Sequence, residues 1–266
     1  MIKTSLYKNE YGLQIQPQYA FRDEWQALAE RENLQFEVLD LSMPSALADE
    51  EQHRMYRDWY RESRRAVSLH GVFIDINPGS GDPAFRELSA RRCEESCEAA
   101  LEIGAENIVF HSSALPFLGG LYLDVWAERC AAFFEELAEK YSLRIFIENS
   151  QAVSPKPLRM MMDRISNPGI GVCLDIGHVN YTPVPLETWM DTLWDRIGYF
   201  HLSDNNGVYD DHLPIGEGTV DWEKADGLWK QLNRKVPLTL EVGGPDGVRK
   251  SLAFLKGHGY FGILGT

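Results

Sequence analysis

The feature that most constrains the fold of this chain is a regular alternation of short apolar segments with longer amphipathic ones. A short apolar run bounded by Gly or Pro is typical of a buried strand, and helical spacing of apolar residues is typical of a helix. We expect strands at residues 2–7, 36–41, 66–72, 107–111, 143–148, 170–175, 197–202 and 237–242. A helix is expected after each, at residues 19–32, 45–64, 83–104, 122–141, 156–166, 185–195, 221–231 and 245–257.

Eight consecutive strand–helix pairs are what a closed (β/α)8 barrel requires. An open, doubly wound sheet is the alternative, but it usually has fewer strands, and no Gly-rich dinucleotide turn follows the first expected strand. We therefore predict an α/β fold of the (β/α)8 (TIM) barrel type, with a single domain over residues 1–266.

Composition limits the classes of function. Hydrophobic residues make up 44% of the chain, which argues against disorder, and no apolar run is long enough to cross a membrane. The first residues lack the pattern of a signal peptide, so we expect a cytoplasmic protein whose four cysteines are reduced. The net charge of −14 disfavours nucleic acid as a partner.

Residues that can bind metal stand at the expected strand ends. In a barrel these ends form one rim, which carries the active site. A single histidine is more often structural than a ligand, but several that converge with carboxylates predict a metal site. Mixed histidine and carboxylate ligands suit Zn2+, Mn2+ or Co2+. The strand-end residues are His70, His111, Glu148, Asp175, His201 and Glu241, and His178, Asp210 and His212 lie in the loops that follow.

Five short segments together resemble the xylose isomerase-like TIM barrels, and the resemblance runs from about Ser68 to Val242. This superfamily comprises sugar and sugar phosphate isomerases and epimerases, together with apurinic/apyrimidinic endonucleases of the endonuclease IV type. The segments are Ile147–Asn149, Cys173–His178, His201–Asp204, His212–Gly218 and Leu240–Glu241.

The resemblance implies two different sets of ligands. In the epimerase branch, the positions matching Glu148, Asp175, His201 and Glu241 hold one ion, and Glu148 and Glu241 also act as acid and base. The endonuclease branch holds three zinc ions. There the three sets would be His70, His111 and Glu148; Glu148, Asp175, His201 and Glu241; and His178, Asp210 and His212. An open alternative is that His70, His111 and His212 contact substrate or support the ligands of a one-metal enzyme.

The loops at the rim favour a small substrate. They are poor in Lys and Arg, which phosphate backbones usually require, and they offer aromatic and amide side chains that suit a polyol. We predict a divalent-metal-dependent isomerase or epimerase of a small sugar, sugar phosphate or related hydroxy-carbonyl compound, acting by proton transfer through a metal-stabilised enediolate. The predicted substrate-binding residues are His178, Asn149, Phe73 and Tyr181.

Two alternatives stay open at this point. One is a multi-zinc phosphodiesterase or phosphatase that resembles endonuclease IV. The other is a non-enzymatic sugar- or metal-binding barrel, which would need no paired carboxylates at the metal. The sequence indicates neither the substrate nor the oligomeric state.

Overall fold

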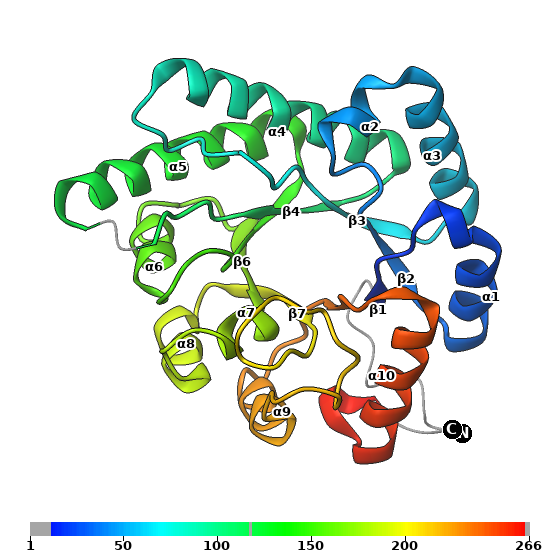
Figure 1. Ribbon diagram of the computed structural model, residues 1–266. Coiled ribbons are helices and arrows are strands. Elements are labelled where there is room, and N and C mark those ends of the chain that lie inside the picture. Colours follow the sequence, from blue (N-terminus) through cyan, green and yellow to red (C-terminus); the bar gives the residue numbers. More distant parts are fainter. Residues whose placement is uncertain (1–11, 117–118, 264–266) are drawn as a thin grey trace.

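Eight parallel strands form a closed barrel in the computed structural model, which describes residues 12–116 and 119–263. Each strand pairs with its neighbours in sequence, and β1 (Leu13–Ile15) closes the barrel by pairing with both β2 (Gln35–Val38) and β8 (Leu238–Leu240). Figure 1 looks along the barrel and shows the helices arranged around the strands. The predicted (β/α)8 fold is confirmed.

The remaining elements follow the expected alternation. The other strands are β3 (Ala66–His70), β4 (Asn107–His111), β5 (Arg144–Glu148), β6 (Ile170–Asp175) and β7 (Ile197–Leu202). The helices are α1 (Arg22–Glu32), α2 (Pro44–Ala48), α3 (Glu50–Ser63), α4 (Pro83–Ile103), α5 (Gly120–Tyr141), α6 (Lys156–Met162), α7 (Ile176–Asn180), α8 (Leu186–Leu193), α9 (Trp222–Gln231) and α10 (Gly244–His258). Two 3-10 turns are η1 (Tyr19–Phe21) and η2 (Tyr260–Gly262).

The first strand of the barrel is not where the sequence pattern placed it. The predicted strand at residues 2–7 lies outside the described residues, and the strand that closes the barrel is Leu13–Ile15. This segment has only three residues, and the polar Gln14 between Leu13 and Ile15 is fully buried. A strand this short, with a polar residue at its centre, lacks the apolar run that marks the other strands.

Capping residues set two helix boundaries. The single helix expected at 45–64 is divided into α2 and α3, because the side chain of Asp49 accepts hydrogen bonds from the backbone N–H groups of Glu51 and Gln52 and starts a new helix. Helix α4 ends as expected before Gly104, which adopts a left-handed conformation with φ +83°.

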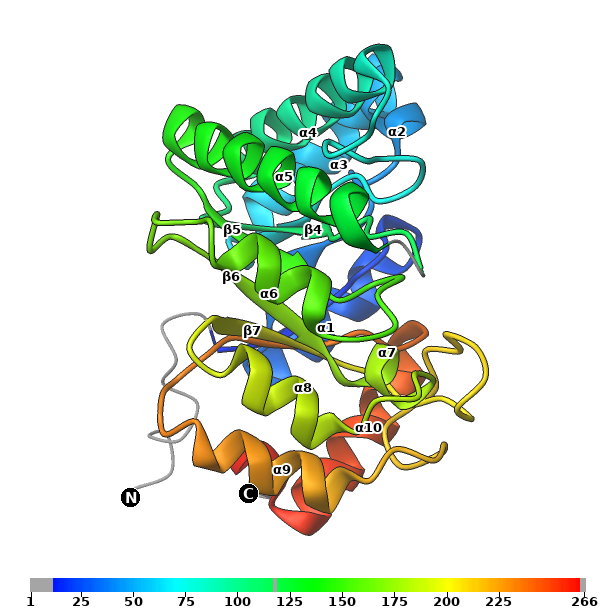
Figure 2. The same cartoon turned by 90° about the vertical axis from the view of Figure 1, so that its left-hand side faces the viewer.

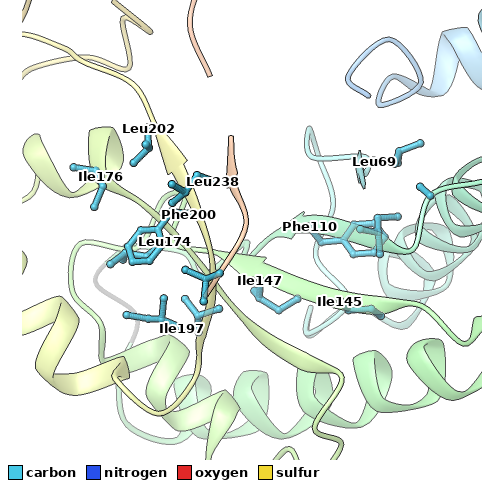
Figure 3. Close-up of a cluster of buried hydrophobic side chains, with 14 of the residues drawn as sticks. Leu69, Phe110, Ile145, Ile147, Leu174, Ile176, Ile197, Phe200, Leu202 and Leu238 are labelled. Atoms are coloured by element: carbon cyan, nitrogen blue, oxygen red, sulfur yellow. The ribbon is translucent and has the colours of Figure 1, made fainter. Parts of the chain in front are cut away.

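The strands separate two layers of side chains. Ile145 and Ile147 of β5 point toward the helices and belong to the large apolar layer between sheet and helices, part of which is shown in Figure 3. Alternate residues point into the barrel, as the sequence predicted for β5. There a smaller buried cluster combines Val109, Phe146, Cys173 and Tyr199 from β4, β5, β6 and β7. This cluster supports the polar residues at the strand ends.

Two further sequence-based expectations concern the state of the cysteines and the length of apolar helices. Cys93, Cys97, Cys130 and Cys173 are all buried and free of disulfides. Among the described residues, no helix combines the length and apolar character needed to cross a membrane.

Figure 2, a side view, shows the yellow loop between β7 and α9 projecting from the end of the barrel at which α7 lies.

Candidate metal centre

Glu148 lies at the centre of the candidate site, at the end of β5. Its Oε2 atom is 3.4 Å from Nε2 of His70, 3.5 Å from Nε2 of His111 and 3.5 Å from Nδ1 of His201. His70 and His111 end β3 and β4, and His201 lies in β7. Parallel strands that end at one rim thus bring side chains far apart in sequence around a single carboxylate.

Two of the expected ligand sets are brought together. In each set, one donor atom per residue can be chosen so that all of them lie within 4.8 Å of one another. We call these sets the four-ligand group and the three-ligand group, and they share Glu148. The four-ligand group is Glu148, Asp175, His201 and Glu241, and the three-ligand group is His70, His111 and Glu148.

The third expected set lies beside the first two, and its members contact one another. Oδ2 of Asp210 is 3.1 Å from Nε2 of His178 and 3.0 Å from Nε2 of His212. Nδ1 of His178 is in turn 2.9 Å from Oε1 of Glu148. Asp210 and His212 come from the loop after β7, so this loop completes the cluster of nine candidate ligands.

The distances and the unpartnered atoms fit a bound divalent ion. Two ligands of a tetrahedral zinc ion with bonds of about 2.05 Å lie about 3.3 Å apart, close to the separations around Glu148. Buried polar atoms normally have hydrogen-bond partners. Two histidine nitrogens lie near carboxylate oxygens here, His178 Nδ1 at 2.9 Å from Glu148 Oε1 and His201 Nδ1 at 2.7 Å from Glu241 Oε2. Even so, several atoms that face this site have no partner in hydrogen-bond geometry: both carboxylate oxygens of Glu148, Oδ2 of Asp175, Nδ1 of His201 and Oε2 of Glu241. These are donor atoms of the four-ligand group, so a cation would satisfy all of them.

Hydrogen bonds fix which nitrogen of two histidines faces the site. Nδ1 of His70 lies 3.0 Å from the carbonyl oxygen of Gly71, and Nδ1 of His212 lies 2.9 Å from that of Glu241. A carbonyl oxygen only accepts, so Nδ1 carries the hydrogen in both rings. The neutral rings therefore keep a lone pair on Nε2, the atom that lies near Glu148 in His70 and near Asp210 in His212.

The electrostatics of the site also favour a cation. Burial raises the pKa of Asp175 to about 7. Burial by itself would also raise the pKa of Glu241, but the neighbouring His201 ring more than offsets this and the pKa falls to about 2. Burial lowers the pKa of His111 to about 4, which keeps this ring in the neutral form that binds metals. Three buried carboxylates in one group thus need positive charge nearby.

Two supporting residues, Glu37 and Gln16, had no counterpart among the residues predicted from the sequence. Glu37 lies in β2, is fully buried, and contacts Nε2 of His201 at 3.1 Å. Gln16 follows β1 and donates to Glu37 Oε1 at 2.8 Å and to Glu241 Oε1 at 3.2 Å. The available signal was a charged residue between two apolar residues, Phe36 and Val38, in a strand that also contains Gln35.

A cavity of about 250 Å3 opens above the ligands and is lined by both His178 and Phe73. The Phe73 ring centroid lies 5.3 Å from that of His70 and 5.1 Å from that of His111. No lysine or arginine is among the described residues that line this cavity. Its volume and polarity suit a small uncharged molecule.

The other two residues predicted to bind substrate, Asn149 and Tyr181, do not line this cavity. Asn149 uses its amide on the backbone of Asp175: its Oδ1 accepts from N at 2.7 Å and its Nδ2 donates to O at 3.1 Å. The Tyr181 ring lies 5.7 Å from the ring of His178. Their contact with substrate stays a prediction, while Asn149 has a clear role in holding Asp175.

Asp204 organises the loop that carries Asp210 and His212. It is fully buried at the end of β7 and accepts four hydrogen bonds, from the backbone N–H groups of Asn205, Gly216 and Val220 and from Nε1 of Trp222. These donors come from both ends of the loop. The carboxylate therefore holds the loop in the shape that brings its two candidate ligands to the rim.

Comparison with known proteins identifies the family. The sequence model of the xylose isomerase-like TIM barrel matches residues 8–258. The chain belongs to this family. The match extends beyond the segment from Ser68 to Val242 in which the resemblance was recognised, and it confirms the prediction drawn from the motifs.

Relatives of this chain include an uncharacterised protein and a probable endonuclease. An uncharacterised protein of Methanocaldococcus jannaschii, MJ1311, is 29% identical over 201 residues, which are 71% of this chain and 69% of that protein. A "probable endonuclease 4" of Mycobacterium marinum is 23% identical over 203 residues, 71% of this chain and 77% of that one.

Solved structures share the fold over nearly the whole chain. The TTHB071 protein from Thermus thermophilus, from a crystal soaked with ZnCl2, is 26% identical with a TM-score of 0.71, covering 92% of this chain and 96% of that one. A D-allulose 3-epimerase from Methylomonas sp. is 18% identical with a TM-score of 0.71, covering 92% and 97%.

Proposed function

We propose that this xylose isomerase-like barrel is a divalent-metal-dependent isomerase or epimerase of a small hydroxy-carbonyl compound such as a sugar. The observation that carries the proposal is the pairing of Glu148 and Glu241 in one ligand group, beneath a small cavity without lysine or arginine among its described lining residues. Isomerisation needs a base and an acid at the reacting carbon, and the two carboxylates are the groups available for this.

Glu148, Asp175, His201 and Glu241 would hold the ion, whose chemistry would be to polarise a carbonyl and acidify the adjacent C–H group. Glu241 is arranged to act as the base. Gln16 donates to its Oε1, while its Oε2 has no hydrogen-bond partner. Oε2 can therefore receive a proton, which Glu241 itself can return to the substrate. Return by Glu148 would instead use a proton that Glu148 has taken from solvent, while Glu241 releases its own to solvent. Phe73 would cover the C–H face of a sugar from the side of the cavity.

An epimerase of known structure shares the barrel fold of this chain. The D-allulose 3-epimerase that shares the fold has also been solved in complex with D-allulose. That enzyme shows that a small sugar can be accommodated on such a barrel, and the proposal for this chain depends on its own carboxylates and cavity.

A second candidate function is hydrolysis of a phosphoester. A specific observation favours it: the three-ligand group and the Asp210 cluster lie beside the four-ligand group, which is more than one ion requires. Several neighbouring divalent ions would neutralise a phosphate and lower the pKa of a water molecule. The likeness to a "probable endonuclease 4" agrees with this alternative.

The test combines metal counting with two assays. Protein purified without chelator is analysed for its metal content, and then incubated with ketoses in D2O and with nitrophenyl phosphate mono- and diesters. The isomerase predicts about one ion per chain and exchange of a substrate C–H with deuterium, which Glu241→Gln abolishes because an amide cannot accept a proton. Glu217→Gln, at a carboxylate paired with Lys250, is the matched control and should retain exchange.

The isomerase would be overturned in favour of the hydrolase by three results together: two or three ions per chain, release of nitrophenol, and no exchange of a substrate C–H with deuterium. The His212→Ala variant separates the two further. In the isomerase it should raise KM more than it lowers kcat. In the hydrolase it should remove an ion and most of kcat. Tight, salt-sensitive binding and incision of duplex DNA with an abasic site would identify the endonuclease form of that alternative.

A further inference from the structure

Glu37 is a charged residue inside the barrel wall, and the role inferred for it rests on the metal-dependent function proposed above. Glu37 lies in β2, and its side chain is fully buried. A buried carboxylate is costly unless it is paired or hydrogen-bonded. No candidate ligand set among the described residues includes Glu37, so its presence at this position needs another explanation.

Four polar side chains converge on the Glu37 carboxylate. Oε1 accepts from Gln16 Nε2 at 2.8 Å, and Oε2 contacts the hydroxyl groups of Tyr199 at 2.5 Å and Thr239 at 3.0 Å and Nε2 of His201 at 3.1 Å. An ionised carboxylate only accepts hydrogen bonds. Every neighbour that bonds to it therefore points a hydrogen toward Glu37.

The first consequence is a fixed orientation of His201. Because Nε2 carries the hydrogen donated to Glu37, the neutral ring has its lone pair on Nδ1. Nδ1 has no hydrogen-bond partner and lies 2.7 Å from Oε2 of Glu241, inside the four-ligand group. Ligating histidines are commonly held in this way, through the ring nitrogen that does not bind the metal.

The second consequence reaches Glu241 through Gln16. The amide group of Gln16 lies between two carboxylates and donates to Oε1 of Glu37 and to Oε1 of Glu241. If this amide were flipped, its oxygen would face both carboxylates, so the network assigns the NH2 group to this position. Oε1 of Glu241 is thereby occupied, and Oε2 is the oxygen left to face His201.

We propose that Glu37 is a positioning residue that fixes two members of the four-ligand group at once: His201 directly, with Nδ1 toward the site, and Glu241 through Gln16. It contacts neither substrate nor metal. By holding both side chains before an ion binds, it raises the affinity of the four-ligand group, and it determines which oxygen of Glu241 is free to accept a proton.

The experiment compares three variants of the full chain. Glu37→Leu removes the acceptor. Glu37→Gln removes the charge and keeps one acceptor oxygen, which at the Oε1 position would face both Gln16 Nε2, now at 2.8 Å, and His201 Nε2, now at 3.0 Å. Thr239→Val is the matched control, because it removes one hydrogen bond from the same carboxylate, and the Thr239 hydroxyl bonds to Glu37 and Tyr199 and not to a candidate ligand. Affinity for Zn2+ and Co2+ is measured by competition with a chelator. The visible spectrum of the Co2+ form reports the geometry of the ligands. The melting temperature of each metal-free protein shows whether the variant folds.

We expect Glu37→Leu to bind the first ion about 10- to 100-fold more weakly, the usual effect of losing such a partner, and to change the Co2+ spectrum. Glu37→Gln should lose up to about tenfold with a smaller spectral change, and Thr239→Val should keep both affinity and spectrum. If Glu37→Leu does not fold, Glu37→Gln decides, since its shape is conserved.

Wild-type affinity and spectrum in both Glu37 variants would overturn the positioning role, and so would an equal loss in Thr239→Val. A wild-type protein that binds no divalent ion would overturn the proposed function as well. A wild-type protein that binds an ion tightly but catalyses no exchange would count against the isomerase alone, because the affinity comparison does not depend on turnover.

Discussion

Replacing Asp204 by Asn should destabilise the loop that carries Asp210 and His212 without changing its length. The two carboxylate oxygens divide the four hydrogen bonds: Oδ1 accepts from Asn205 N at 3.0 Å and Val220 N at 3.1 Å, and Oδ2 accepts from Gly216 N at 2.9 Å and Trp222 Nε1 at 2.8 Å. An asparagine has one acceptor oxygen, so its NH2 group must face two N–H donors.

The magnitude follows from these contacts. Hydrogen bonds to a charged group contribute about 1.5–3 kcal/mol each, so the loss of two predicts a fall of about 3–6 kcal/mol in the free energy of unfolding. At about 2–4 °C per kcal/mol for a chain of this size, the melting temperature should fall by roughly 6–24 °C. Detachment of the loop before global unfolding would place the effect at the lower end.

The assay is thermal unfolding of the metal-free protein, followed by circular dichroism and by tryptophan fluorescence, to which Trp222 contributes. Asp211→Asn is the matched control, because Asp211 is exposed in the same loop, and it should leave the melting temperature unchanged. An Asp204→Asn protein that melts within about 2 °C of wild type would refute the assignment of Asp204 as the residue that holds the loop.

Two further predictions concern single carboxylates. Asp175→Ala removes one member of the four-ligand group, so dialysed protein should retain less divalent metal; unchanged content by elemental analysis would contradict the ligand set. Burial raises the pKa of Asp40 despite hydrogen bonds from Tyr60 and Tyr19. The stability that Asp40 contributes is therefore present below its unfolded pKa of about 3.9 and is lost as pH rises through the folded pKa. Asp40→Asn should accordingly gain in melting temperature relative to wild type as the pH rises above about 4, and parallel pH profiles would argue against this.

The fold and the ligands could be predicted because both leave a local signal in the sequence. Short apolar runs mark β4, β5 and β6, and these strands end in His111, Glu148 and Asp175. Parallel strands in a barrel end at one rim, so the order of elements alone brings these side chains together.

The supporting residues could not be predicted in the same way. Glu37 is recognised only by the donors around it, and these come from β7, β8 and the residue after β1. Asp204 likewise resembles any polar residue after a strand until its four donors are seen. Strand β1 has three residues with a glutamine at the centre, so its position is set by pairing with β2 and β8 and not by its own composition.

The closure of the barrel through β1 has a consequence for how this protein comes to hold a metal ion. Leu13–Ile15 pairs with Leu238–Leu240, and Gln16 bonds to Glu241 across 225 positions of the sequence. Contacts between such distant segments form late in folding, because the entropy of closing the loop must be overcome first. A growing polypeptide on the ribosome has no complete four-ligand group until residue 241 has been synthesised and has docked. The four-ligand group can therefore acquire an ion only at the end of biogenesis. Until then β1 and β7 each have an unpaired edge that can associate with other chains.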